Sequence, residues 1–185
     1  MALIIFDWDD TLCPTTWLYY SDMVAKSGPF TREQHEWLHI ISVHIKSTLS
    51  IASTYGHVMI LTNASPGWVL YCVRRYFPQC ESNVQRCDVH YAWNAEEPNF
   101  TKWKKLHLST YTTSTTPYTC VLGVGDRWDD REAVRSTFQN KCCVNTVKFM
   151  DKPQVSDLVY QLIVVGHMFD HLARCLLYTS PSPRD

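Results

Sequence analysis

The fold is decided by the stretch Leu3-Ile4-Ile5-Phe6-Asp7-Trp8-Asp9-Asp10-Thr11-Leu12. Its first four residues predict a buried β-strand rather than a helix, because the apolar run is short and an acidic residue follows at once. In extended backbone, side chains two positions apart point to the same side, so Asp7 and Asp9 face one site and Trp8 faces away. Turn formation and helix capping are the alternative use of aspartates at such a position.

Working outward, apolar strands alternate with helices along the chain. Strands are predicted at residues 3–6, 58–61, 84–91, 118–124 and 142–147, the third from a weak pattern. Helices are predicted at 31–56, 68–77, 100–109, 129–138 and from 155 onward, with loops at 13–30 and 110–116. This alternation predicts an α/β fold, a Rossmann-like parallel sheet between two helical layers.

The first long helix carries the clearest local signals. Thr31 followed by Gln34 forms a capping-box pattern at its start, and Gly56 is expected to end it. Its apolar face is predicted from spacing to contain Trp37, Ile40, Ile41, His44, Ile45 and Leu49.

Polar residues follow three of the predicted strands. Asp7 and Asp9 follow the first strand, Thr62 and Asn63 the second, and Asp126 the fourth. In parallel sheets the carboxyl ends of the strands gather the reactive groups. Paired carboxylates stay ionised only beside a cation or hydrogen-bond donors, and a hard divalent ion with oxygen ligands, best matched by Mg²⁺, meets that need. Asp130, one turn into the next helix, could orient a metal-bound water.

Composition excludes several classes of protein. The 185 residues contain 17 Lys and Arg against 18 Asp and Glu, so no basic surplus predicts nucleic-acid binding. No apolar run reaches the roughly 18 residues of a membrane span, and no signal peptide precedes the first strand. We therefore expect a cytoplasmic protein with reduced thiols. The sequence does not specify its oligomeric state.

One domain is expected over residues 1–174. The closing stretch 175–185 ends in Tyr-Thr-Ser-Pro-Ser-Pro-Arg-Asp. We expect it to lie outside the domain, as a translated sequencing-adapter artefact or a disordered tail rich in Ser and Pro.

Four segments together resemble the haloacid dehalogenase (HAD) superfamily of hydrolases. Asp7-x-Asp9-x-Thr11-Leu12 is similar to its first motif, Ile60-Leu61-Thr62-Asn63 to its second, and Gly125-Asp126-x-x-x-Asp130 to its fourth. A lysine near the start of the helix at Trp103 is similar to the third. The motifs follow in order over residues 3 to about 147, and the resemblance implies a HAD-like three-layer fold.

The resemblance implies a Mg²⁺-dependent phosphatase that acts through an aspartyl-phosphate. Asp7 would be the nucleophile, and Asp9 would protonate the leaving oxygen and later activate water. Thr62, with Asn63, would bind the phosphoryl oxygens, and the lysine would neutralise charge. Mg²⁺ would lie among Asp7, the backbone carbonyl of Asp9, Asp126 and Asp130.

The motif lysine and the second acid of the fourth motif are open. Lys102, Lys104 and Lys105 lie near one helix start. The pattern Trp103-Lys104-x-x-His107-Leu108 resembles protist-type members of the superfamily and favours Lys104, with Lys102 second. Spacing favours Asp130 over Asp129.

Arg127 stands where many members have a small residue. It could narrow the pocket, contact an anionic substrate or point to solvent.

Neither the segment from Asp7 to Thr62 nor that from Thr62 to Lys104 is long enough for a sizeable cap domain. We therefore expect a minimal cap and an open site, partly covered by an aromatic flap at residues 17–20. Such a site suits a phosphorylated macromolecule, although a small phosphorylated molecule is also possible. The alternatives are a phosphotransferase or mutase, or a non-catalytic module that binds phosphate or protein.

Overall fold

The computed structural model describes residues 1–25, 28–111 and 118–178, with side chains as far as Phe169. Its strands are β1 (Ala2–Phe6), β2 (Gly56–Thr62), β3 (Asp88–Tyr91), β4 (Cys120–Gly125) and β5 (Cys143–Lys148). Its α-helices are α1 (Thr15–Tyr20), α2 (Arg32–Tyr55), α3 (Trp68–Tyr76), α4 (Glu81–Val84), α5 (Trp103–Tyr111), α6 (Trp128–Phe138) and α7 (Val155–Tyr178). Short 3₁₀ turns, η1 (Pro78–Cys80) and η2 (Phe100–Lys102), precede α4 and α5.

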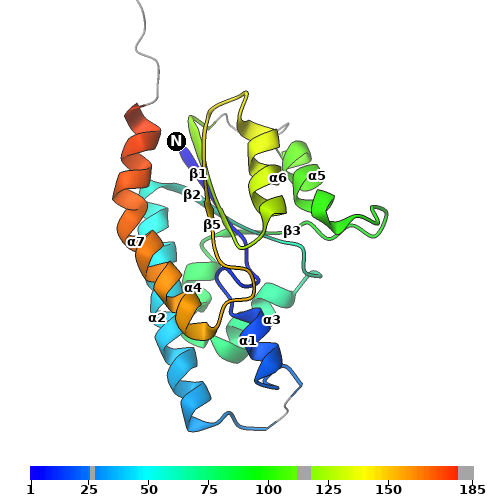
Figure 1. The fold of residues 1–185 in the computed structure, drawn as a ribbon, viewed down its shortest axis with the longest axis vertical. Helices are drawn as coiled ribbons and strands as arrows, with labels where there is room; N and C mark the ends of the chain where they lie inside the picture. The colour runs from blue at the N-terminus through cyan, green and yellow to red at the C-terminus, as the bar shows by residue number, and fades with distance from the viewer. Residues whose placement is uncertain (26–27, 112–117, 179–185) are drawn as a thin grey trace, which may run out of the picture.

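The five strands form one all-parallel sheet in the order β3-β2-β1-β4-β5 (Figure 1). The chain first moves outward from β1 to β2 and β3, then returns to place β4 on the other side of β1. Phe6 at the end of β1 is consequently level with Ile60 on one side and Val124 on the other. This reversal creates a crevice at the carboxyl ends of β1 and β4.

Side chains of the central strand alternate between two cores. Ile4 and Phe6 pack in the core beneath α2 and α7, whereas Leu3 and Ile5 pack in the core beneath α5 and α6. Figure 1 shows α2 and α7 side by side on one side of the sheet and α5 and α6 on the other. The expected Rossmann-like α/β/α arrangement is thus confirmed.

The capping box of α2 forms as the sequence predicts. The Thr31 hydroxyl accepts a hydrogen bond from the Gln34 amide (3.2 Å), and the Gln34 side chain accepts one from the Thr31 amide (2.9 Å). The predicted apolar face is wrong at Ile40, which is exposed. Leu38 is buried instead, so the buried stripe of α2 is rotated slightly toward that residue.

Two other expectations need correction. Strand β3 begins at Asp88, and Val84 instead ends the short helix α4, which the sequence analysis missed. The predicted loop 110–116 begins within α5, which continues through Tyr111, and its remainder lies outside the described residues.

Helix α7 extends through Tyr178 and so contains the first residues of the predicted tail, whereas 179–185 lie outside the described part. Among the helices that the structure describes, none combines the length and apolar character needed to cross a bilayer.

Candidate active site

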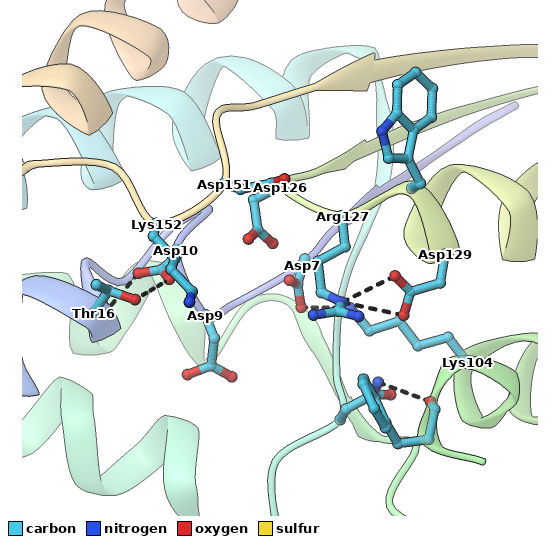
Figure 2. Close-up of a pocket in the computed structure, with 13 residues that line it drawn as sticks. Asp7, Asp9, Asp10, Thr16, Lys104, Asp126, Arg127, Asp129, Asp151 and Lys152 are labelled. Carbon is cyan, nitrogen blue, oxygen red and sulfur yellow. Dashed lines mark hydrogen bonds and ion pairs between the residues drawn. The ribbon is translucent and has the colours of Figure 1, made fainter.

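Asp7 and Asp126 follow the neighbouring strands β1 and β4, so their carboxylates lie at one edge of the sheet (Figure 2). The Asp7 amide continues the parallel pairing by donating to the Val124 carbonyl at 2.9 Å. Both aspartates line a pocket of about 520 Å³, together with Asp9 and Lys104. The structure therefore brings these residues together around one pocket at the carboxyl edge of the sheet.

Lys104 on α5 joins two carboxylates in the interior of the site. Its ammonium donates to Oδ1 of Asp7 and to Oδ1 of Asp130, each at 2.6 Å, and all three side chains are at least nine-tenths buried. Lys102 is exposed, so the structure brings Lys104 and not Lys102 to the cluster. Asp130 and Asp7 raise the pKa of Lys104 above its usual value although burial opposes them, and the group is charged at neutral pH.

Asp130, rather than Asp129, belongs to the cluster. Its second oxygen accepts a hydrogen bond from the Arg127 amide at 3.0 Å, which caps the start of α6. Gly125 makes room for this side chain, because a Cβ there would lie 2.7 Å from the Cβ of Asp130. Asp129 instead pairs with the Arg127 guanidinium.

Among the described residues, the carboxylates of Asp7, Asp126 and Asp130 form a group that could hold a metal ion. One oxygen from each lies within 4.8 Å of the others, and Oδ1 of Asp126 is buried without a hydrogen-bond partner among the described residues. Burial and the neighbouring carboxylates of Asp130 and Asp10 raise the pKa of Asp126 to about 7.

Burial also raises the pKa of Asp7 well above its usual value, despite the opposing charge of Lys104. The ammonium of Lys104 pairs with Asp7 and Asp130 and not with Asp126, so three neighbouring carboxylates have one cation among them and could hold a further one. All-oxygen donors fit Mg²⁺.

The carboxylate of Asp9 lies outside this group and is held by three donors. Its Oδ1 accepts from the Thr15 hydroxyl (2.7 Å) and from the indole Nε1 of Trp68 (2.8 Å), and its Oδ2 accepts from the Thr62 hydroxyl (2.9 Å). In Figure 2 it points away from Asp126. A metal contact by Asp9 was expected through its backbone carbonyl, which this side-chain placement does not test.

Thr15 and Trp68 were missed by the sequence analysis. Thr15 begins α1 and Trp68 begins α3, and both elements end up beside the loop that follows β1. Nothing in the local sequence marks either residue as a partner of Asp9.

Asp10, next to the predicted pair, was also missed. Its backbone has φ of +54°, a left-handed conformation that Asp tolerates better than most residues. Its carboxylate accepts hydrogen bonds from both the amide and the hydroxyl of Thr16. Burial raises its pKa, and the bonds from Thr16 partly offset the shift.

The residues predicted to bind phosphoryl oxygens lie at the end of β2. The Thr62 hydroxyl donates to Asp9 and accepts from the amide of Ala64 at 3.0 Å. Asn63 lines the pocket and donates to the Phe100 carbonyl at 3.2 Å. Its side-chain oxygen is buried and has no partner among the described residues.

The pocket walls differ from the expected aromatic flap. Residues 17–20 form most of α1, and none of them lines the pocket. Phe100 and Trp128 provide its aromatic surface, and Arg127 and Lys152 lie at its rim.

The arrangement offers a buried carboxylate fixed by an ammonium, a set of oxygens for a divalent cation, and a second carboxylate within the same pocket. These groups can bind an anion and can support nucleophilic and acid–base chemistry. No protein-family model, curated protein or solved structure matches the chain.

Proposed function

We propose that the protein is a Mg²⁺-dependent phosphatase-like hydrolase that acts through an aspartyl-phosphate at Asp7. The observation that carries the proposal is the ammonium of Lys104 held at 2.6 Å from both Asp7 and Asp130, beside the unpartnered buried oxygen of Asp126. Catalysis of phosphoryl transfer requires mainly that the reacting groups are positioned and that negative charge is compensated, and this cluster can provide both.

The topology gives independent support. A five-stranded parallel sheet with acidic residues after β1 and β4 agrees with what the resemblance to the HAD superfamily implies. One pocket is lined by a residue from each of the four segments that carry the resemblance, namely Asp7, Asn63, Lys104 and Asp126, and this supports the proposal. We therefore include membership of the HAD superfamily in the proposal.

In the first half of the reaction, a carboxylate oxygen of Asp7 attacks phosphorus. A P–O bond to Asp7 forms, the P–O bond to the leaving group breaks, and Asp9 gives its proton to the leaving oxygen. In the second half, Asp9 takes a proton from water, whose oxygen attacks phosphorus. The bond to Asp7 then breaks and releases phosphate.

The carboxylate of Asp9 can carry a proton while it keeps these contacts. All three groups that bind it act as donors, and among the described residues its Oδ2 accepts only the bond from Thr62, so a lone pair of that oxygen remains for the proton that it transfers. The three donors come from α1, β2 and α3, and together they fix the position of the carboxylate.

Asp7, Asp126 and Asp130 would hold Mg²⁺, with the backbone carbonyl of Asp9 as the further expected ligand. The ion would neutralise charge on the transferring phosphoryl group. Lys104 fixes the orientation of Asp7 and compensates its charge, and Asn63, which lines the pocket, would position the substrate with Thr62.

The substrate is a phosphorylated molecule that enters an open pocket. In the described part of the chain, the segments between β1 and β3 are used by helices that pack on the sheet, and no inserted domain covers the pocket. This arrangement favours a macromolecular phosphoester over a small buried substrate.

The test is hydrolysis of 4-nitrophenyl phosphate by the full chain, with Mg²⁺ and with EDTA. We expect Mg²⁺-dependent release of phosphate that Asp7→Asn reduces by at least a hundredfold. Glu132→Gln, which removes an exposed acid from α6, is the matched control and retains activity.

Equal activity of Asp7→Asn and wild type, or no turnover by either, would favour a non-catalytic phosphate- or protein-binding module. Transfer of the phosphoryl group to an added alcohol in preference to water would identify a phosphotransferase.

A further inference from the structure

Arg127 lies directly after Asp126, at the start of α6, and lines the same pocket as Asp7 and Lys104. Its side chain is 45% exposed, so it is neither buried in the core nor fully in solvent. The guanidinium is the candidate for contact with whatever substrate enters the pocket.

Two contacts fix this guanidinium. Its Nε donates to both carboxylate oxygens of Asp129, at 2.9 and 3.2 Å, as the dashed lines in Figure 2 show. On another side its Cζ lies 4.9 Å from the centre of the Phe100 ring, a cation–π contact. An arginine held in this way loses little further conformational entropy when it binds a ligand.

The terminal NH₂ groups of Arg127 remain available. Neither has a hydrogen-bond partner among the residues that the structure describes, and both hydrogen bonds to Asp129 use Nε. Among the other cations near the pocket, Lys104 is shared by Asp7 and Asp130, and Lys148 is paired with Asp151. Lys152 also lines the pocket, but its ammonium is a point charge without the planar fork of a guanidinium.

We propose that Arg127 binds a carboxylate on the leaving group of the substrate, so that the preferred substrates are phosphomonoesters with a carboxylate near the phosphate. A guanidinium fork matches the two oxygens of a carboxylate. Phe100 and Asp129 position the fork, and Lys104 and the metal ligands serve the phosphoryl group. This inference rests on the proposed phosphatase function and narrows its substrate class.

The experiment compares kcat/KM for substrates that differ in one carboxylate. 3-Phosphoglycerate and glycerol 3-phosphate form the small-molecule pair, and a phosphoserine peptide with Glu or Gln after the phosphoserine forms the peptide pair. We expect wild type to prefer the carboxylate member of at least one pair by about tenfold, and the pair that responds identifies the source of the carboxylate.

Arg127→Gln should reduce this preference to about one, and Arg127→Lys should restore only part of it, because lysine has charge without the fork. Arg135→Gln, an exposed arginine on the same helix, is the matched control and retains the preference. Equal kcat/KM within both pairs for wild type, or an unchanged preference in Arg127→Gln, would overturn the inference.

Binding separates this inference from the proposed function. If wild type hydrolyses neither 4-nitrophenyl phosphate nor the pairs, calorimetry measures the dissociation constants of the same compounds. If the carboxylate member of a pair binds more tightly to wild type, and Arg127→Gln removes that difference, the anion site is supported even though the phosphatase proposal has failed. Equal dissociation constants within both pairs would reject the anion site as well.

Discussion

The ammonium of Lys104 lies 2.6 Å from the carboxylate of Asp7, although 97 positions separate the two residues in the chain. The same ammonium lies 2.6 Å from Asp130, which belongs to a third segment. One buried cation thereby joins the end of β1, the start of α5 and the start of α6. Its removal leaves two buried carboxylates without their partner, which makes the contact a direct test of the site.

Lys104→Met should lower the free energy of unfolding by about 3 kcal/mol in EDTA at pH 7.5, because breaking a buried ion pair leaves uncompensated charge. It should also abolish phosphatase activity. Urea denaturation followed by circular dichroism measures the change in stability. Lys102→Met removes an exposed lysine two residues away and should alter stability by less than about 0.5 kcal/mol. Similar losses in both variants would show that the buried ammonium has no special role.

Mg²⁺ should raise the melting temperature of wild type, because a ligand that binds only the folded state stabilises that state by mass action. At a Mg²⁺ concentration a hundred times the dissociation constant, the free energy of unfolding should rise by about 2.7 kcal/mol. Asp126→Asn should remove most of this response in a thermal-shift titration. Asp157→Asn, which changes an acid far along the chain on α7, should retain it.

The metal-free behaviour of Asp126→Asn provides a second readout. The pKa of Asp126 is raised to about 7 in the folded protein, so the folded state holds a proton that the unfolded state releases near pH 4. The contribution of Asp126 to stability in EDTA therefore falls as pH rises from about 4 to 7. Asp126→Asn should show a smaller fall, and at pH 8 without metal it should be at least as stable as wild type. An unchanged pH slope would contradict this assignment.

Trp68→Phe should lower kcat about tenfold with less than a twofold change in KM. The indole donates to Asp9 and does not line the pocket, so its loss misplaces the acid without removing a substrate contact. The ring also stacks on Tyr71, a contact that Phe can keep. Steady-state kinetics over a range of pH checks the result, because a displaced Asp9 also shifts the pH profile. Trp93→Phe, at a half-exposed tryptophan elsewhere, should leave both constants unchanged.

Gly125→Ala should destabilise the protein by about 1–3 kcal/mol and reduce activity, because the added methyl group would collide with Asp130. Differential scanning calorimetry and the phosphatase assay give the two readouts. Gly166→Ala is the matched control. Its Cβ would meet only Ile51, at 3.8 Å, and a helical alanine should stabilise the fold by about 0.5–1 kcal/mol. A Gly125→Ala protein with wild-type stability would mean that Asp130 can move freely.

A pair of histidines makes stability depend on pH away from the site. His107 on α5 lies 3.0 Å from His90 on β3, and burial lowers the pKa of both rings below the usual 6.5. The folded state therefore favours the neutral rings, while the unfolded state takes up protons below about pH 6.5. The contribution of this pair to stability should therefore fall as pH decreases through this range, opposite in direction to the contribution of Asp126.

Urea denaturation at pH 7.5 and 5.5 measures this loss. Replacing both rings, as His90→Gln with His107→Gln, should make the loss on acidification smaller than in wild type. His39→Gln, at an exposed histidine of α2, should leave it unchanged. An equal loss in the double variant would assign the pH dependence to other groups.

The sequence predicts the frame of the fold well because its signals are local. The capping box at Thr31 and the apolar runs of β1, β2 and β4 each determine their own element. Helix α4 was missed because its four residues have no periodicity to detect. The boundary of β3 was misplaced for the same reason, since a four-residue edge strand carries little pattern.

The candidate site was predicted in part. Asp7 and Asp126 could be placed together because the carboxyl ends of parallel strands share one edge, and Asp130 because it lies one turn into the helix that follows Asp126. The positions of these aspartates in the sequence do not predict the contact with Trp68, because its hydrogen bond to Asp9 depends on how α3 packs. The choice of Lys104 over Lys102 likewise depends on which face of α5 packs against the sheet. The sequence has three lysines near the start of that helix and does not show which of them lies on the inner face.

The position of β1 at the centre of the sheet has a consequence for the growing polypeptide. Ala2 pairs with Gly56 on one side and with Cys120 on the other, so one edge of β1 stays open until β4 has been synthesised. Contacts between such distant segments form slowly, and an open apolar strand is prone to self-association while it waits. Ribosome-bound chains that end between β3 and β4 should therefore depend on chaperones, and release from them should coincide with the emergence of β4.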